Sequence, residues 1–167
     1  MIRFFDGPSI RDYVFDSSSR RKVVIRPDLS FTLKGKKFFV EVDRGTMSLK
    51  RFREKIRGYR EYIKSGAFSE RYGITDFKLL TTAPSEERRN NLLEQVIEEG
   101  GVARCFLGVF DEVISNPLGD VWIRGKEYRE MLDSLPEKAR ERILKARRKG
   151  ERDKLVRNHV KMYSLLS

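Results

Sequence analysis

Two stretches of the chain, residues 23–33 and 37–43, are rich in β-branched and aromatic residues and flank a short polar segment that contains Gly35. Such runs on either side of a glycine-containing turn are typical of two paired strands. The pattern therefore predicts a β-hairpin over about residues 23–43, in which successive side chains point to opposite faces.

The segment that follows has a helical period. Its apolar stripe repeats every three or four positions and consists of Phe52, Ile56, Tyr59 and Ile63. Thr46 or Ser48 can cap the start of this helix, and Gly66 follows its expected end near Ser65. Gly58 lies inside the helix at a cost in helix propensity, which indicates either close packing or a ligand that passes nearby.

The rest of the chain alternates between the two kinds of pattern. It predicts strands over 76–82, 102–109 and 121–123, a helix from Pro84 to Gly100, and helical structure from Glu127 onward with breaks at Pro136 and Gly150. This order predicts an α/β fold with a mixed central sheet flanked by helices. We expect an α/β domain over 1–135 and a basic helical extension over 136–167, packed on it or next to it.

Three acidic residues stand on or beside the predicted hairpin. Glu41 and Asp43 are two positions apart and share a face of their strand. If the hairpin loop has an even number of residues, Asp28 falls on the same face, opposite Glu41 or Asp43 depending on the register. Carboxylates this close repel one another unless a cation lies among them, and hard oxygen ligands favour Mg²⁺ or Mn²⁺. The alternative is a solvated strand face with three ordinary acids.

The charge of the chain favours a polyanionic partner. Its 36 Lys/Arg and 25 Asp/Glu residues give a formal net charge of +11. Residues 136–167 hold eleven basic and four acidic residues and so carry +7 of this total. An excess of positive charge on a protein of this size most often serves nucleic-acid binding, although a solvated helical tail is the simpler alternative.

Other features restrict the location of the protein. No apolar run approaches the length of a membrane span, and the N-terminal residues lack the apolar core of a signal peptide. The single cysteine, Cys105, lies in a predicted buried strand, where a core residue is more common than a nucleophile. One cysteine permits no internal disulfide and suits a reducing compartment, so we expect a cytoplasmic protein with no membrane partner.

An antiparallel hairpin that carries Pro27-Asp28 and then Glu41, followed by a helix and a further strand, resembles the PD-(D/E)xK nuclease superfamily. The resemblance implies a restriction-endonuclease-like core in which Asp28 and Glu41 bind the catalytic Mg²⁺ or Mn²⁺. The family's lysine, two positions after the acid, would fall on Asp43. Some members carry an acid there and others take the lysine from the adjacent helix, for which Lys55, Lys50 and Arg44 are candidates.

A closer resemblance is to the replication-relaxation family of plasmids, phages and integrative elements. It rests on Arg26-Pro27-Asp28, on the string from Phe39 to Thr46, and on the helix that carries Lys55, Tyr59 and Tyr62, and it spans about residues 23–83. Members usually carry a winged-helix DNA-binding region before this part, and only about twenty residues precede the sheet here. The resemblance therefore implies DNA contact through the nuclease-like core and the basic C-terminal tail.

Together these observations predict a metal-dependent DNA endonuclease of a mobile element, which hydrolyses phosphodiester bonds during replication, mobilisation or DNA processing. Asp28, Glu41 and Asp43 would be the metal ligands, and Lys55 would complete the catalytic set. The main alternative is a non-catalytic DNA-binding protein that retains a nuclease fold, in which Asp43 forms a structural salt bridge with Arg44 and Arg26. A relaxase with a tyrosine nucleophile normally needs several histidines, and the chain has one.

The DNA-binding residues are expected on the strand ends, the first long helix and the tail. They are Arg26, Arg44, Lys50, Arg51, Arg147, Arg148 and Lys149. Tyr59 is expected to pack in the core because it lies on the apolar stripe, whereas Tyr62 is expected to contact DNA or to donate a hydrogen bond to the acidic site. Many nucleases of the PD-(D/E)xK fold act as dimers, so the resemblance also allows a homodimer.

Overall fold

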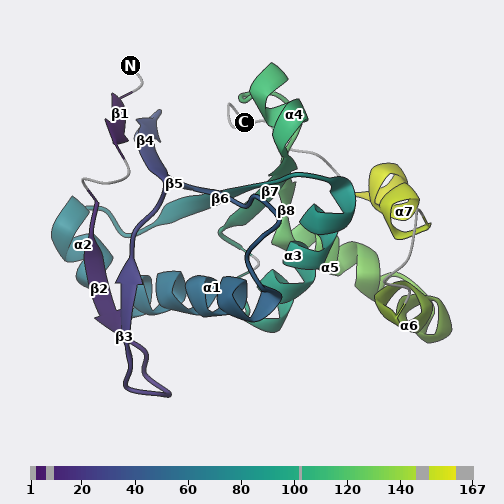
Figure 1. Ribbon diagram of the computed structural model, residues 1–167, viewed down its shortest axis with the longest axis horizontal. Coiled ribbons are helices and arrows are strands. Elements are labelled where there is room, and N and C mark those ends of the chain that lie inside the picture. The colour runs from purple at the N-terminus through teal and green to yellow at the C-terminus, as the bar shows by residue number, and fades with distance from the viewer. Residues whose placement is uncertain (1–2, 7–9, 102, 146–150, 161–167) are drawn as a thin grey trace.

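A mixed sheet with the strand order β1-β4-β5-β6-β7-β8 forms the centre of the protein in the computed structural model, which describes residues 3–6, 10–101, 103–145 and 151–160 (Figure 1). Its strands are β1 (Arg3–Asp6), β4 (Leu29–Leu33), β5 (Lys36–Val42), β6 (Phe77–Ala83), β7 (Cys105–Val109) and β8 (Ile123–Arg124). The central strands β5, β6 and β7 are parallel, and the outer pairs are antiparallel. The prediction of a mixed α/β sheet is confirmed.

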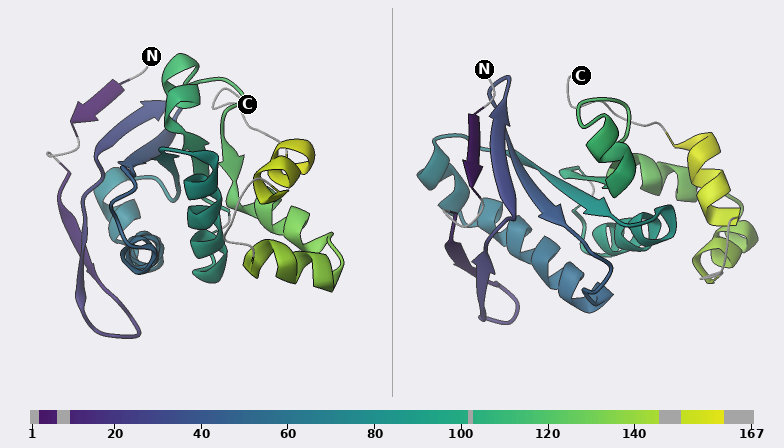
Figure 2. Two further views of the ribbon diagram at one scale, coloured as in Figure 1. Left: turned by 45° about the vertical axis from the view of Figure 1, so that its right-hand side comes forward. Right: turned by 45° about the horizontal axis from the view of Figure 1, so that its top comes forward.

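Helices cover one face of this sheet more fully than the other. The crossovers between the parallel strands are α1 (Leu49–Lys64), which is followed by the short α2 (Ala67–Tyr72), and α3 (Glu86–Glu98). In the left view of Figure 2, α1 is seen almost end-on and α3 lengthwise beside it, and the two helices contact each other directly. The larger apolar core lies between them and the sheet, whereas the opposite face carries a smaller cluster around Phe31, Phe38 and Trp122 near α4 (Phe110–Ser115).

The predicted hairpin over 23–43 divides at Pro27. β3 (Lys22–Ile25) does not enter the central sheet but pairs with β2 (Asp12–Phe15) in a separate two-stranded sheet that packs on α1. Only β4 and β5 form the hairpin within the central sheet. The prediction of a single hairpin was therefore wrong at its start, because proline has no N–H to donate to a ladder and interrupts the strand.

The turn between β4 and β5 sets the register of the acidic residues. Lys34 and Gly35 have positive φ angles of 49° and 74°, as a two-residue type I′ turn requires. Leu33 pairs with Lys36, and the register continues to the pair of Leu29 and Val40. One further step along this register places Asp28 opposite Glu41, as a loop with an even number of residues allows.

Helix α1 begins and ends close to the predicted limits. Ser48 accepts a hydrogen bond from the backbone N–H of Arg51 at the N-terminus, and Gly66 takes a positive φ of 80° beyond the C-terminal cap. Gly58 faces the small sheet, where an added Cβ would lie 2.5 Å from Val23 Cγ1. Close packing of the β2–β3 hairpin therefore explains this glycine.

The C-terminal helices pack on the domain. α5 (Gly125–Asp133) lies against α3, and α6 (Glu137–Lys145) and α7 (Glu151–His159) follow it at the far end of the molecule (Figure 1). Ile143, Val156 and Val160 are buried and belong to the main core. The guanidinium of Arg152 is buried as well and bonds Glu94 on α3. The segment from 136 therefore contributes to the core besides its charge.

The structure also bears on Cys105, on the short elements and on membrane-spanning helices. Cys105 is a buried residue of β7, and burial raises the pKa of its thiol to about 12, so it is a core residue as expected. Strand β1 and helices α2 and α4 were not predicted, because all three are short and lack a clear period. No helix within the described residues is long and apolar enough to cross a membrane.

Candidate nucleic-acid interface and acidic cluster

Glu41 is buried, with 4% of its surface exposed. It lies near the end of β5, on the face covered by α1. Its Oε1 accepts a hydrogen bond of 2.7 Å from the hydroxyl of Tyr59, and its Oε2 forms a short ion pair with the ammonium of Lys55. Lys55 and Tyr59 are one turn apart on α1, so they reach the same carboxylate.

Burial and these two partners shift the pKa of the Glu41 carboxyl in opposite directions. Burial raises the pKa of the Glu41 carboxyl, while Lys55 and Tyr59 lower it; the net shift is upward. Burial beside this carboxylate also raises the pKa of Tyr59 well above its usual value of 10.0. Tyr59 was predicted to pack in the core, and it does so while donating this hydrogen bond. Tyr62 was expected to contact DNA or to donate a hydrogen bond to the acidic site; its hydroxyl donates to Asp12 on β2, so the second alternative was wrong.

Asp28 is exposed and lies at the mouth of the same cluster. Its Oδ2 accepts a hydrogen bond of 2.8 Å from the backbone N–H of Val42, which ties the start of β4 to the end of β5. Its negative charge contributes to the raised pKa of Glu41. The structure thus brings Asp28 and Glu41 together, one exposed and one buried.

Asp43 has a different partner from the one expected. Its carboxylate accepts two hydrogen bonds from the guanidinium of Arg88, of 2.6 and 3.2 Å, and Arg88 also donates to the carbonyl of Met47. The suggested salt bridge with Arg44 and Arg26 was therefore wrong. Arg88 occupies the first turn of α3, which directly follows β6. Because β6 pairs in parallel with β5, the start of α3 lies beside the end of β5. No local sequence pattern reveals this proximity.

The arrangement offers two carboxylates rather than three in one place. Within the described part of the chain, no group of three or more His, Cys, Asp or Glu side chains is placed to hold a metal ion. One polar atom beside Glu41 is nevertheless unsatisfied. Thr81 pairs with Glu41 across β5 and β6, and its buried hydroxyl has no hydrogen-bond partner among the described residues.

A groove of about 770 Å³ opens next to this cluster, between the β2–β3 hairpin and the start of α1. Its charged lining residues are the six cations Arg21, Lys22, Arg26, Arg51, Lys55 and Arg57 and the two acids Asp16 and Glu54. Arg57 bonds Glu99, and Lys55 bonds Glu41. The other four cations are exposed, so the groove presents a positive surface to solvent.

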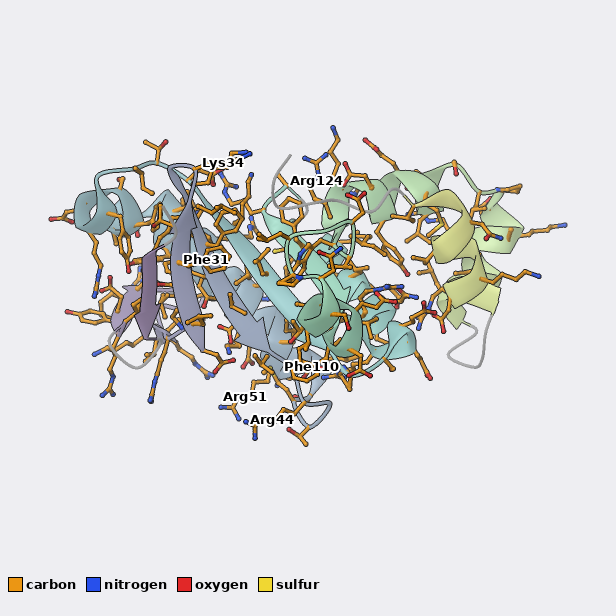
Figure 3. All side chains as sticks on the ribbon, turned by 90° about the horizontal axis from the view of Figure 1, so that it is seen from above. Phe31, Lys34, Arg44, Arg51, Phe110 and Arg124 are labelled. Carbon is orange, nitrogen blue, oxygen red and sulfur yellow. The ribbon has the colours of Figure 1, made fainter. Side chains whose placement is uncertain are left out.

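The predicted DNA-binding residues lie partly on this groove. Arg26 and Arg51 line it, whereas Arg44, just after β5, and Lys50, at the start of α1, are exposed but are not among its lining residues. Figure 3 shows Arg44 and Arg51 at the same edge of the molecule, at the bottom of that view. The remaining three residues of the prediction, Arg147, Arg148 and Lys149, lie outside the described residues.

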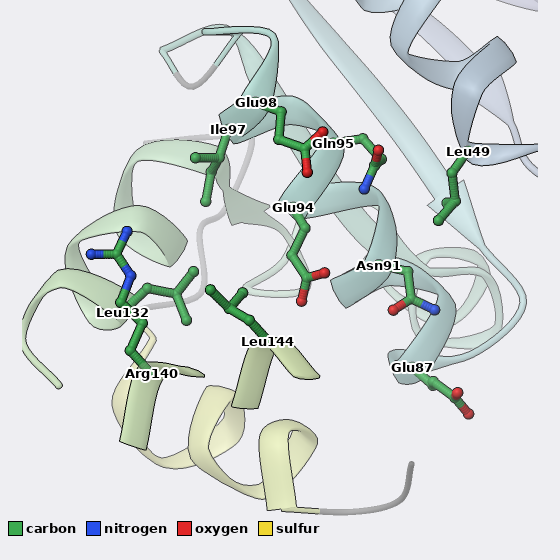
Figure 4. A pocket seen from close by; sticks show the side chains of 10 residues that line it. All are labelled: Leu49, Glu87, Asn91, Glu94, Gln95, Ile97, Glu98, Leu132, Arg140 and Leu144. Atoms are coloured by element: carbon green, nitrogen blue, oxygen red, sulfur yellow. The ribbon is translucent and has the colours of Figure 1, made fainter. Parts of the chain in front are cut away.

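A second depression differs from the groove in charge. It measures about 560 Å³ and lies where α3 meets α5 and α6 (Figure 4). Glu87, Glu94 and Glu98 line it together with Arg140 and apolar side chains. Glu94 is held by Arg152, and Glu98 pairs with Arg53. Its acidic lining does not suit a polyanion, so the basic groove is the better candidate for nucleic acid.

Besides Arg88, sequence reasoning missed the contributions of Tyr59, Arg21 and Lys22 to this region. The role of Tyr59 could have been inferred, because Lys55 and Tyr59 have the i, i+4 spacing that lets both reach one acid. The exposed cations Arg21 and Lys22 belong to β3 and the turn before it, and they join the groove only because β3 leaves the central sheet.

Comparison with known proteins gives one match. The model of the replication-relaxation family matches residues 8–77, which is less than half of the chain. This region begins before β2 and ends at the first residue of β6, so it contains Asp28, Glu41, Asp43, Lys55 and Tyr59 but not Arg88. No curated protein and no solved structure matches the chain.

Proposed function

We propose that this protein binds DNA in the groove between the β2–β3 hairpin and α1, in a replication or mobile-element process of the kind that the replication-relaxation match suggests. The observation that carries the proposal is the lining of the groove. Exposed arginines and lysines outnumber acids there, and a row of such cations binds the phosphate backbone with release of counterions.

The packing of the groove supports this proposal. β3 and α1 form two of its walls, and connecting segments supply the rest of the lining. The hairpin is held against α1 because Gly58 leaves room for it and Asp12 accepts hydrogen bonds from Tyr62 and Arg71. A cationic surface held in place before binding loses little conformational entropy when it meets a phosphate backbone.

The proposal is tested with fluorescence anisotropy on labelled DNA over a range of salt concentrations. The groove variant replaces Arg21, Arg26 and Arg51 with alanine. The matched control removes the same charge from exposed residues of α5 and α6, as Lys126→Ala, Arg129→Ala and Lys138→Ala. We expect the slope of log K against log salt to become shallower by about 2 to 3 in the groove variant only, at roughly 0.9 per lost phosphate contact. Equal weakening in both variants contradicts the proposal.

A second candidate function is metal-dependent hydrolysis of the bound DNA, and the Asp28–Glu41 pair favours it. In proteins Mg²⁺ is commonly held by one or two carboxylates together with water and substrate phosphates, so two acids suffice. The unsatisfied hydroxyl of Thr81 beside Glu41 is a further polar atom that a ligand would satisfy. The residues present therefore fit such an ion, with Asp28 and Glu41 as ligands and Asp43 bound to Arg88.

When bound, a divalent ion would polarise a phosphate and lower the pKa of a coordinated water. The chain itself would contribute the remaining steps. Lys55, now paired with Glu41, would be free to neutralise a phosphate once the carboxylate is engaged elsewhere, and the hydroxyl of Tyr59 would keep Glu41 oriented. In PD-(D/E)xK nucleases this role more often belongs to a lysine that follows the acid by two positions. Here Lys55, from the adjacent helix, would take that role.

Cleavage and metal binding are tested separately. Calorimetric titration with Mn²⁺ is expected to detect binding by the wild type that is lost in Glu41→Gln and Asp28→Asn, whereas Asp111→Asn on α4 serves as a control. Incubation of linear, branched and single-stranded DNA with Mg²⁺ or Mn²⁺ then tests cleavage. If the wild type binds DNA but does not bind Mn²⁺ and does not cleave the DNA, the non-catalytic DNA-binding function remains.

A further inference from the structure

The outward face of the β2–β3 hairpin carries large apolar side chains that the main core does not use. Tyr13, Phe15 and Val24 are 54%, 62% and 48% exposed. The register pairs Tyr13 with Val24 and Phe15 with Lys22, so all four side chains stand on one face. The inward face carries Val14 and Ile25, both of which are buried.

The two aromatic rings are arranged as neighbours. Their centroids are 6.2 Å apart in an edge-to-face contact, and the ammonium of Lys22 lies 4.0 Å from the centroid of the Tyr13 ring. The ammonium lies over the face of the Tyr13 ring, so the pair combines aromatic surface for stacking with a cation that can contact phosphate.

The exposed charges of the hairpin segment are of one sign. Between residues 10 and 26, the exposed charged side chains are all basic: Arg11, Arg20, Arg21, Lys22 and Arg26. The two acids of this segment are engaged. Asp12 accepts from Tyr62 and Arg71, and Asp16 is bonded within the turn by Ser18 and Ser19.

We propose that this face is a stacking platform for the unpaired bases of single-stranded nucleic acid. The inference rests on the proposed binding in the basic groove and specifies its substrate class. Lys22 and Val24 belong both to the platform and to the groove lining, so one strand can lay its phosphates along the groove while its bases stack on Tyr13 and Phe15. In a duplex the base faces are covered by their neighbours, so exposed rings contribute to binding only when bases are unpaired.

The test compares three labelled ligands of equal length: a single strand, the same strand with abasic positions, and a duplex. The variant Tyr13→Ala/Phe15→Ala removes the platform, and Phe110→Ala/Ile114→Ala removes two exposed apolar side chains of α4 as a control. Each ring is expected to contribute roughly 5- to 150-fold to single-strand affinity. The platform variant should therefore lose at least about 25-fold on the single strand and less than about 2-fold on the other ligands. Tyr13→Phe should retain the affinity.

The outcomes separate this inference from the groove proposal. If the platform variant binds all three ligands like wild type while the variant of Arg21, Arg26 and Arg51 weakens all three, the platform is refuted and groove binding remains. If neither variant weakens binding, both proposals fail. If the platform variant instead changes the sedimentation coefficient of the protein, the face is an interface between copies of the chain and the inference is overturned. Thermal unfolding confirms that each variant is folded.

Discussion

Replacing Lys55 with alanine isolates the energetics of the acidic cluster. The substitution leaves the Glu41 carboxylate, which is 4% exposed, with the hydroxyl of Tyr59 as its remaining direct partner. Removing one member of a buried ion pair typically costs about 3–5 kcal/mol. The side chain of Lys55 is 31% exposed, so solvent already screens the pair, and we expect a loss of about 2 kcal/mol in the free energy of unfolding near neutral pH.

This loss depends on pH in a defined direction. The folded-state pKa of Glu41 already lies above its ordinary value of 4.5, and loss of the ammonium raises it further. The folded protein then holds a proton that the unfolded chain releases, so the penalty grows as the pH rises from about 4.5 through the folded pKa. Below that window the carboxyl is protonated in both states, and Lys55→Ala should cost little.

Urea unfolding at about pH 5 and pH 7.5 measures both effects. The single tryptophan, Trp122, is 2% exposed and reports on the core. Lys50→Ala is the control, because Lys50 is exposed on the same helix. Glu41→Gln added to Lys55→Ala should recover most of the loss, since it removes the stranded charge and keeps an acceptor for Tyr59. The reasoning is refuted if Lys55→Ala matches the control at both pH values, or if its loss is larger at the lower pH.

Three further predictions follow from packing. Arg88→Ala strands the buried carboxylate of Asp43 and should lower the free energy of unfolding by roughly 2–4 kcal/mol in the same assay, while Arg88→Lys should recover only part of it. Gly58→Ala adds a methyl group 2.5 Å from Val23. The overpacking should cost about 1–3 kcal/mol and outweigh the gain of about 1 kcal/mol in helix propensity, so the melting temperature should fall. A higher melting temperature would contradict this. Deletion of 136–167 should lower the melting temperature, because the segment buries three aliphatic side chains of the core; an unchanged melting temperature would make it a separable tail.

The local pattern of the chain was sufficient for most of the elements. The caps and apolar stripe of α1, the strand at β6 and the glycine turn between β4 and β5 were all predicted, because each depends on residues within a few positions of one another. The sequence left open whether Asp28 lies opposite Glu41 or Asp43, and the two-residue turn of the folded hairpin decided for Glu41. The net charge of +11 likewise follows from composition alone, and so does the expectation of a polyanionic partner.

The partners of the acids depended on the tertiary structure. Arg88 reaches Asp43, 45 positions earlier, only because the parallel pairing of β5 and β6 brings the start of α3 to the end of β5. The basic groove exists because Pro27 directs β3 out of the central sheet and Gly58 admits the hairpin against α1. Local propensity specifies where a strand or helix forms. Which charges meet is decided by packing between distant segments, since the energy of an ion pair depends on distance and burial in the folded state.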